Sequence, residues 1–362
     1  MDMRTDKRLD IGVIGLGTYG QYRAEILDNF GHRMYGADTD LDREQDDVSD
    51  FEGGLYDTPS ALYEQDIDAV VIATPNKFHE PIAVSAMECG IDVFIEKPLA
   101  HTMESASRIA ETAKETGRIC MTGFQNRFLN VCNILKWYID EGYFGGINHI
   151  QASYTRRRGV PGRGSWFTSK EIAGGGAVID IGIHVFDLLF YFLDSPTVST
   201  VTSSTRSDFG HRESYAYLDM WGEDDDANMF NVEDAASGFI EFENGCTATI
   251  EIAWATNVEP EHAYYIHGTE MGAHLDITDI VESEADVVQM LDFYRAETGG
   301  ADHFLDTTVT TNRNDPYRDQ MAMFTDAVAT GEAPAVNTVT QALDTQRLVH
   351  RIYEQNDLTE PF

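Results

Sequence analysis

The feature that most constrains the fold is a glycine-rich loop near the N-terminus, set between an apolar run and a segment of helical periodicity. The apolar run is LDIGVIGL, the loop reads GLGTYG, and QYRAEILDNF follows with apolar residues at helical spacing. A strand, a GxGxxG loop and a helix in this order are typical of the first βαβ unit of a dinucleotide-binding domain. The context therefore favours dinucleotide binding over an ordinary glycine turn.

Each residue of this loop has an expected role. Gly15 permits the tight turn, Gly17 lets the backbone approach the pyrophosphate, and Gly20 allows close packing of helix on strand. Thr18 and Tyr19 complete the loop, where the N–H groups and the positive end of the helix dipole attract phosphate. Tyr19 can cover the dinucleotide or simply pack at the start of the helix.

Asp38 ends the second apolar run and is the expected partner of the adenosine ribose. A carboxylate there accepts hydrogen bonds from the ribose hydroxyls and repels a 2′-phosphate. Its neighbours Thr39 and Asp40 carry no positive charge. The alternative is that Asp38 only begins a turn, since ADTD is turn-like. We expect NAD as the cofactor, with NADP as the second possibility.

Further along, the pattern predicts two domains of different architecture. The runs HRMYGAD, AVVIATP, IDVFIEKP and RICMTGF alternate with helical segments, which predicts a doubly wound parallel sheet over residues 1–125. Residues 126–362 contain several strand-like runs with few helices between them, and two closing helices. They predict an α+β domain with a large, mostly antiparallel sheet that binds substrate and subunits.

The charge of the chain argues against nucleic-acid binding and bears on the salt content of its surroundings. The 62 acidic residues against 25 basic ones give a formal net charge of −37, which disfavours nucleic-acid binding. The acidic residues are spread along the chain. This is either an ordinary acidic protein or one adapted to a salt-rich cytoplasm, and an excess of this size favours the second interpretation, a halophilic source.

Cysteine spacing and hydropathy indicate the cellular compartment in which we expect the protein. Cys89, Cys120, Cys132 and Cys246 show no CxxC spacing, so we expect separate thiols rather than a disulfide or zinc framework. No apolar run approaches the roughly 20 residues that cross a bilayer, and the N-terminus lacks a signal-peptide pattern. We therefore expect a cytoplasmic protein that does not bind a membrane.

Glu96, Lys97 and Pro98 stand at the end of the fourth strand, on the same sheet edge as the glycine loop. A lysine there can be merely solvated. However, lysine is rare in this chain, Glu96 lies beside it, and Pro98 restricts the backbone where a ligand is expected. We interpret Lys97 as a residue of the ligand site and include Glu96 among the cofactor-binding residues.

Four motifs, taken with the glycine loop, resemble one known family. GVIGLGTYG, VIATPNKFHEPIA, VFIEKPLA, GFQNRF and GGGAVIDIGIHVFDLL occur in the order found in the glucose–fructose oxidoreductase, inositol 2-dehydrogenase and MocA family. The resemblance implies a Rossmann domain followed by an open-faced antiparallel sheet, a catalytic Lys97 and a cis Lys97–Pro98 peptide. It also implies that four residues lie near the cofactor: Thr74, Pro75, Asn76 and His79. From its position alone, His79 can equally be a local helix cap.

Asp180 and His184 are spaced four residues apart, so a helix starting near Ile179 puts both on one face. The alternatives are a helical acid with a core histidine, or a metal site, for which no third ligand stands at a predictable spacing. The resemblance makes both residues catalytic. Oxidation of a secondary alcohol needs a base, a role suited to His184, while Lys97 stabilises alkoxide charge and Asp180 orients substrate or imidazole.

Other positions carry weaker signals. Arg127 can bind substrate hydroxyls or form a salt bridge at the domain junction, and Trp166 lies in a loop expected to be mobile near the substrate. Tyr154 and Arg156 fit sheet packing and surface charge better than substrate binding. Residues 200–310 contain no motif that we can relate to chemistry.

The leading prediction is an NAD(P)-dependent dehydrogenase acting on a secondary hydroxyl of a sugar, cyclitol or related polyol. The alternatives are a reductase or dehydrogenase of a non-sugar substrate, an NAD-assisted glycosidase, and a non-catalytic nicotinamide-binding regulator. The alternation at residues 247–254 gives one apolar face, which an antiparallel sheet buries under its own helices or against a partner. Because sheets of this family commonly pair, we expect a homodimer or homotetramer.

Overall fold

The computed structural model describes residues 7–41, 51–216, 230–278 and 287–356. It forms two compact units, Met1–Gln125 with Pro316–Gln346, and Asn126–Asp315 with Arg347–Phe362. The sequence places residues 316–346 in the second domain, whereas in the structure they lie in the first unit. The reason is packing that no local pattern reveals: Phe324 contacts Phe94 edge-on, with ring centroids 5.5 Å apart.

The first unit is built on a six-stranded sheet of order β3-β2-β1-β4-β5-β6, in which all neighbours are parallel. Its strands are β1 Asp10–Ile14, β2 Arg33–Ala37, β3 Leu55–Tyr56, β4 Ala69–Ile72, β5 Asp92–Ile95 and β6 Cys120–Thr122. β4 and β5 are buried along their whole length, as expected for a sheet covered on both faces. The predicted doubly wound parallel sheet is confirmed.

Helix α4, Met103–Thr116, begins and ends at residues that cap it. In α4, the Thr102 hydroxyl accepts a hydrogen bond from the Ser105 N–H, and Gly117 ends the helix in the left-handed region. The helices are α1 Thr18–Asn29, α2 Pro59–Tyr63, α3 His79–Glu88, α4 Met103–Thr116 and α8 Pro316–Thr330, with a short helix η1 Asn76–Phe78 before α3. The last helix, α9 Val339–Gln355, starts in the first unit and ends in the second.

The second unit is dominated by an eight-stranded sheet of order β14-β13-β12-β11-β7-β10-β9-β8. Every neighbouring pair is antiparallel except β7 with β10. Its strands are β7 Ile147–Thr155, β8 Val198–Arg206, β9 Ala235–Phe242, β10 Thr247–Ala253, β11 Glu261–Gly268, β12 Gly272–Asp276, β13 Val287–Glu297 and β14 His303–Asn312. The predicted large, mostly antiparallel sheet is confirmed.

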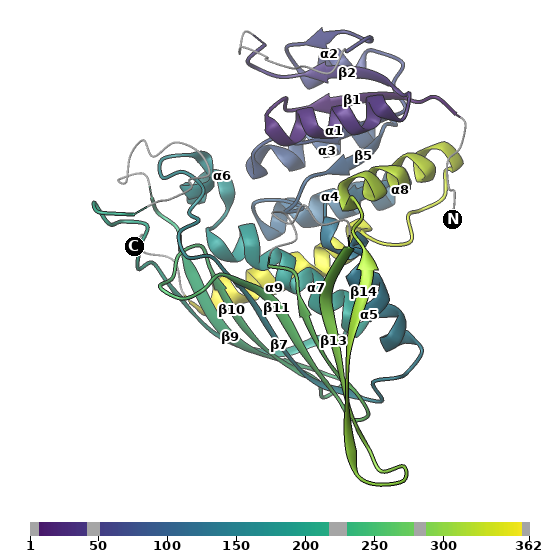
Figure 1. Ribbon diagram of the computed structural model, residues 1–362. Helices are drawn as coiled ribbons and strands as arrows, with labels where there is room; N and C mark the ends of the chain where they lie inside the picture. The colour runs from purple at the N-terminus through teal and green to yellow at the C-terminus, as the bar shows by residue number, and fades with distance from the viewer. Residues whose placement is uncertain (1–6, 42–50, 217–229, 279–286, 357–362) are drawn as a thin grey trace. The chain divides into compact units, whose positions relative to one another are not determined.

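Helices of the same unit cover one face of this sheet. α5 Asn130–Asp140 and α7 Ile183–Leu193 lie against it (Figure 1). The apolar face predicted for residues 247–254 is buried there, with Ile252 and Trp254 fully inaccessible. On the opposite face, Phe239 of β9 and Tyr265 of β11 are exposed. The unit's own helices therefore bury the predicted apolar stripe.

Among the residues that the structure describes, one stretch, Lys170–Leu193, is long and apolar enough by length and composition to cross a membrane; its most apolar window has a mean hydropathy of 1.7. From the sequence we expect no such run. Of the most apolar window, 83% is buried inside the structure. Core helices pass the same test, so this stretch is weak evidence for a membrane span.

Candidate functional site

The glycine loop has the geometry that a dinucleotide requires. Gly15 has φ +90°, and a Cβ on Gly20 would lie 1.9 Å from the Gly15 carbonyl oxygen, so both positions demand glycine. A Cβ on Gly17 would meet nothing within 4 Å, and Gly17 precedes α1 without a side-chain cap. Thr18 and Tyr19 are exposed at the start of that helix. A helix N-terminus without a side-chain cap, beside open space at Gly17, fits a bound pyrophosphate.

Asp38 starts a turn, the alternative considered from the sequence, and it also contacts the glycine loop. Its Oδ2 accepts the Leu16 N–H at 2.6 Å, and its Oδ1 accepts the Asp40 N–H at 3.0 Å. The second contact is an Asx-type turn, and the first ties the end of β2 to the glycine loop. The carboxylate is therefore held at the loop where the adenosine ribose is expected.

His79 braces the segment after β4 against the segment after β5. The ring is buried, its Nδ1 lies 2.9 Å from the Pro98 carbonyl oxygen, and its Nε2 lies 2.9 Å from that of Thr74. Burial lowers the pKa of His79, and a neutral ring donates to one carbonyl at a time. Both nitrogens face backbone carbonyl oxygens outside its own helix, so the predicted contact of His79 with the cofactor stays a prediction. The cis Lys97–Pro98 bond is confirmed next to this brace.

A buried arginine, Arg23 of α1, holds Glu96 in place. Its Nε donates to Glu96 Oε1 at 2.7 Å, and its Nη2 donates to Gln320 Oε1 of α8 at 2.8 Å. The guanidinium also lies 4.9 Å from the ring centroids of Phe94 and Tyr317. This network fixes the end of β5 immediately before Lys97. The Glu96 carboxylate is thus engaged by Arg23, which the sequence analysis did not single out.

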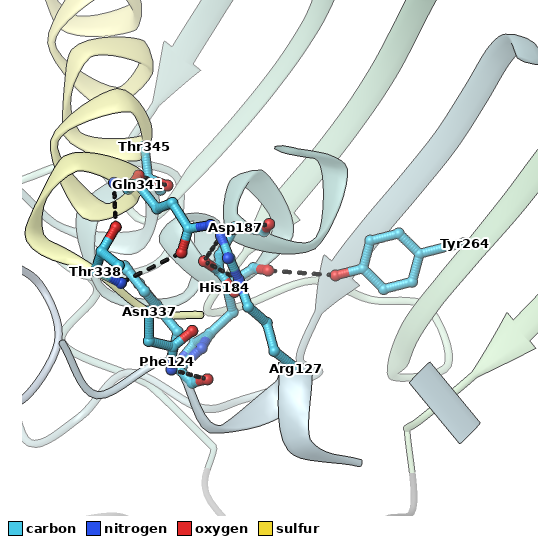
Figure 2. A network of polar contacts seen from close by, with 9 residues as sticks. All are labelled: Phe124, Arg127, His184, Asp187, Tyr264, Asn337, Thr338, Gln341 and Thr345. Atoms are coloured by element: carbon cyan, nitrogen blue, oxygen red, sulfur yellow. Dashed lines mark hydrogen bonds and ion pairs between the residues drawn. The ribbon is translucent and has the colours of Figure 1, made fainter. Parts of the chain in front are cut away.

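Asp180 and His184 lie on consecutive helical turns in the second unit. The expected helix is present, but its first part is a π turn, η4 Val178–Gly182, which leads directly into α7. Trp254 Nε1 donates to Asp180 Oδ2 at 2.9 Å. The Tyr264 hydroxyl lies 3.5 Å from the His184 carbonyl oxygen (Figure 2). Short π turns of this kind occur frequently at functional sites.

Arg127 forms a salt bridge with Asp187 inside the second unit. The Arg127 Nε donates to both Asp187 oxygens at 2.9 and 3.0 Å, and Nη2 approaches Oδ1 at 2.7 Å (Figure 2). Both side chains are 1% exposed. Burial raises the pKa of Asp187 to about 6, with Arg127 acting in the opposite direction. Of the two roles predicted for Arg127, the structure shows the salt bridge, within one unit rather than at the junction.

The segment expected to be a loop around Trp166 contains two short helices, η3 Trp166–Thr168 and α6 Lys170–Ala173. The indole stacks on Phe167 with centroids 3.7 Å apart. The Thr168 hydroxyl accepts from the Gly164 N–H and donates to the Ser165 carbonyl, which closes the turn. Trp166 is half-buried on this turn, and its predicted contact with substrate stays a prediction.

Tyr154 of β7 packs within the sheet, as the sequence favoured, in an aromatic group with two residues of β11 that no sequence motif indicates. Tyr154 stacks on His262 with centroids 3.9 Å apart and planes 8° apart, and Arg156 donates to the Tyr154 hydroxyl at 2.8 Å. His262 Nε2 lies 3.2 Å from the Tyr264 hydroxyl. Burial, helped by Arg156, lowers the pKa of His262 to about 3.

His262 should make folding stability depend on pH. Its folded-state pKa lies below the unfolded value of about 6.5, so the unfolded chain binds its proton first as the pH falls. Between pH 7 and pH 5 this group alone should cost about 2 kcal/mol. Denaturant unfolding at both pH values should show that His262→Gln loses less stability on acidification than the parent. His303→Gln, at an exposed position, is the control, and equal losses in all three proteins would contradict the assignment.

Comparison with known proteins identifies the family. Residues 9–124 match the oxidoreductase family with an NAD-binding Rossmann fold, and residues 134–274 match the GFO/IDH/MocA C-terminal domain. The chain belongs to the GFO/IDH/MocA oxidoreductase family. The resemblance seen in the sequence motifs is thereby confirmed, and the first unit contains an NAD-binding Rossmann domain.

Individual relatives are sugar oxidoreductases by name. The chain is 35% identical to D-glucoside 3-dehydrogenase of Escherichia coli (strain K12) over 61% of its own length and 62% of that protein's. It is 33% identical to a putative UDP-kanosamine synthase oxidoreductase subunit of Amycolatopsis mediterranei (strain S699), over 55% and 54%. The matched region is thus less than two thirds of either relative. The fold is similar to that of levoglucosan dehydrogenase in complex with NADH, with a TM-score of 0.78 at 22% identity over 96% and 97% of the chains.

Proposed function

We propose that the protein is an NAD-dependent dehydrogenase that oxidises a secondary hydroxyl of a sugar, cyclitol or related polyol. The observation that carries the proposal is the Asp180–His184 turn, in which an imidazole and a carboxylate anchored by Trp254 stand one helical turn apart. The NAD-binding domain of the same chain, and relatives named for sugar oxidation, support it.

The proposed roles follow from the charge changes in the reaction. His184 accepts the hydroxyl proton, because a neutral imidazole is a suitable base near neutral pH. The Lys97 ammonium stabilises the alkoxide that develops, and Asp180 orients the hydroxyl or the imidazole. NAD held at the glycine loop of Gly15, Gly17 and Gly20 would supply the acceptor for the hydride that leaves the carbinol carbon. Arg127 already pairs with Asp187, so we propose no direct contact between its guanidinium and substrate.

A spectrophotometric screen tests this function. Purified protein is incubated with a panel of sugars, glycosides and inositols, each with NAD and with NADP, at low salt and in molar KCl. Reduction of the nicotinamide with at least one polyol is the expected result. Tight binding of NAD without turnover of any panel member would contradict the proposal and favour a nicotinamide-binding regulator.

We also propose that subunits associate through the open face of the large sheet and that salt promotes this association. The exposed rings of Phe239 and Tyr265 on that face, and the net charge of −37, support the proposal. Molar salt shortens the Debye length to about 3 Å and weakens repulsion between the acidic subunits. Light scattering across a KCl series should show a dimer or tetramer that strengthens with salt, and a monomer at every concentration would contradict it.

Cofactor preference should depend on Asp38. The double substitution Asp38→Ser with Thr39→Arg removes the repulsion of a 2′-phosphate and adds a guanidinium to pair with it. Charge-assisted hydrogen bonds contribute about 1.5–3 kcal/mol, so the ratio of kcat/KM for NADP over NAD should rise about 10- to 100-fold. Thr39→Arg alone is the control and should shift the ratio less. A parent enzyme that already prefers NADP would show the assignment to be wrong.

A further inference from the structure

The helical run that carries Asp180 and His184 begins without a capping side chain of its own. It follows the glycine triplet Gly174–Gly176, and glycine has no side chain to satisfy the first free N–H groups of a helix. Glu233, which precedes β9, takes this role. Its carboxylate accepts the Gly176 N–H at 3.0 Å and the Val178 N–H at 2.9 Å, and its backbone oxygen accepts the Ala177 N–H at 3.1 Å. One residue thus satisfies three consecutive donors.

The carboxylate of Glu233 is fully buried, with 0% of the residue exposed. The Tyr353 hydroxyl of α9 donates to its Oε1 at 2.8 Å. Burial raises the pKa of Glu233, whereas the Val178 and Gly176 N–H groups and Tyr353 favour the charged form. A buried carboxylate is costly unless it is hydrogen-bonded, so this set of donors makes the position specific for a side chain of this shape.

Two glycines of the triplet, Gly175 and Gly176, are explained by their contacts with the same residues. A Cβ on Gly176 would lie 1.9 Å from the Glu233 backbone oxygen, and a Cβ on Gly175 would lie 2.0 Å from the Tyr353 hydroxyl. The chain therefore passes against Glu233 and Tyr353 too closely for any larger residue. The Gly176 carbonyl in turn accepts the Asp180 N–H at 3.0 Å, so the clamped residue is bonded directly to the backbone of Asp180.

We propose that Glu233 is a positioning residue for the active site. It clamps the first turn of the helical run, and through that turn it sets the directions of the Asp180 and His184 side chains. The kinetic consequence rests on the proposed function of these two residues, but the clamp itself is independent of it. Displacing catalytic groups by about 1 Å can reduce turnover about 100-fold.

The neighbouring residue, Asp234, supplies a matched control. It is equally buried, and its carboxylate accepts the N–H groups of Asp208, Phe209 and Gly210 at 3.1, 2.6 and 2.9 Å. It therefore secures a different loop, distinct from the turn that carries Asp180. If Glu233 has only a structural role, loss of either carboxylate should lower kcat to the same extent. A positioning role predicts a larger fall in kcat when the Glu233 carboxylate is lost.

The experiment compares Glu233→Ala, Glu233→Gln and Asp234→Asn by hydrogen–deuterium exchange and by kinetics. In the Glu233 variants, exchange should rise in peptides covering residues 174–184, while Asp234→Asn should raise it in peptides covering 207–216. We expect Glu233→Ala to lower kcat about 10- to 100-fold with the Kd for NAD unchanged. Glu233→Gln should retain more activity, because its amide oxygen still accepts one of the N–H groups.

Two results would overturn the proposal. One is unchanged exchange at residues 174–184 in both Glu233 variants, which would show that the clamp does not hold this turn. The other is a loss of kcat in Asp234→Asn as large as in Glu233→Ala, which would indicate a general effect of a buried charge. If Glu233→Ala does not fold, Tyr353→Phe removes one donor to the same carboxylate and should raise exchange at 174–184. Failure of the parent to oxidise any polyol would refute the proposed function. Hydrogen–deuterium exchange at residues 174–184 would still show whether Glu233 holds this turn.

Discussion

Replacement of Lys97 by Met should lower kcat by about 100- to 1000-fold, the loss seen when one group that stabilises developing oxyanion charge is removed. Methionine keeps an unbranched side chain as far as the ε position and lacks the ammonium group. In the proposed mechanism that charge acts on an alkoxide which exists only near the transition state, so kcat should fall and the Kd for NAD should stay nearly constant. Steady-state kinetics and NAD titration by fluorescence measure the two quantities separately.

Lys114→Met provides the matched control for this change. Lys114 is exposed in the last turn of α4, so its loss should leave both kcat and NAD binding unchanged. Near-normal turnover of the Lys97 variant would remove Lys97 from the mechanism. A parallel loss of NAD binding would instead assign Lys97 to cofactor binding, and the proposed role in stabilising charge would be wrong.

The largest effect on stability is expected from Arg127→Met. Removing the guanidinium leaves the Asp187 carboxylate buried without its charged partner, which typically costs about 3–5 kcal/mol. For a unit of this size that corresponds to a fall in Tm of roughly 6–20 °C. The double variant Arg127→Met with Asp187→Leu should recover most of the loss, because no charge is then left buried.

The loss of folding stability caused by Arg127→Met should also be smaller at low pH. Without Arg127, nothing opposes the effect of burial, so the pKa of Asp187 rises further above its unfolded value. A carboxyl group whose folded pKa is raised favours the folded state while protonated, and this contribution is lost as the pH rises. Thermal unfolding at pH 5 and pH 7.5 measures the difference, with Arg157→Met of the exposed Arg157–Glu259 pair as control. A loss of stability of the same size at pH 5 and pH 7.5 would contradict the raised pKa of Asp187 in this variant.

The sequence by itself determined the elements whose signals are local. The glycine loop, the buried runs of β1, β4 and β5, and the placement of Lys97 at a strand end all follow from patterns within ten or so residues, and each has the predicted form. Motif order alone was enough to identify the family. Periodicity also predicted which face of β10 is apolar, because alternate residues of a strand point to opposite faces.

Only the tertiary structure decided which residues support the candidate site. Arg23 bonds Gln320 across 297 positions of sequence, and Glu233 bonds Val178 across 55. Trp254 reaches Asp180 from 74 positions away, and Arg127 reaches Asp187 from 60. A buried charged side chain pairs with whichever residue the fold brings close to it, at any separation along the sequence. Neither local propensity nor hydrophobic periodicity encodes that separation. For the same reason residues 316–346, helical by pattern, could be assigned to a unit only through their packing on β5.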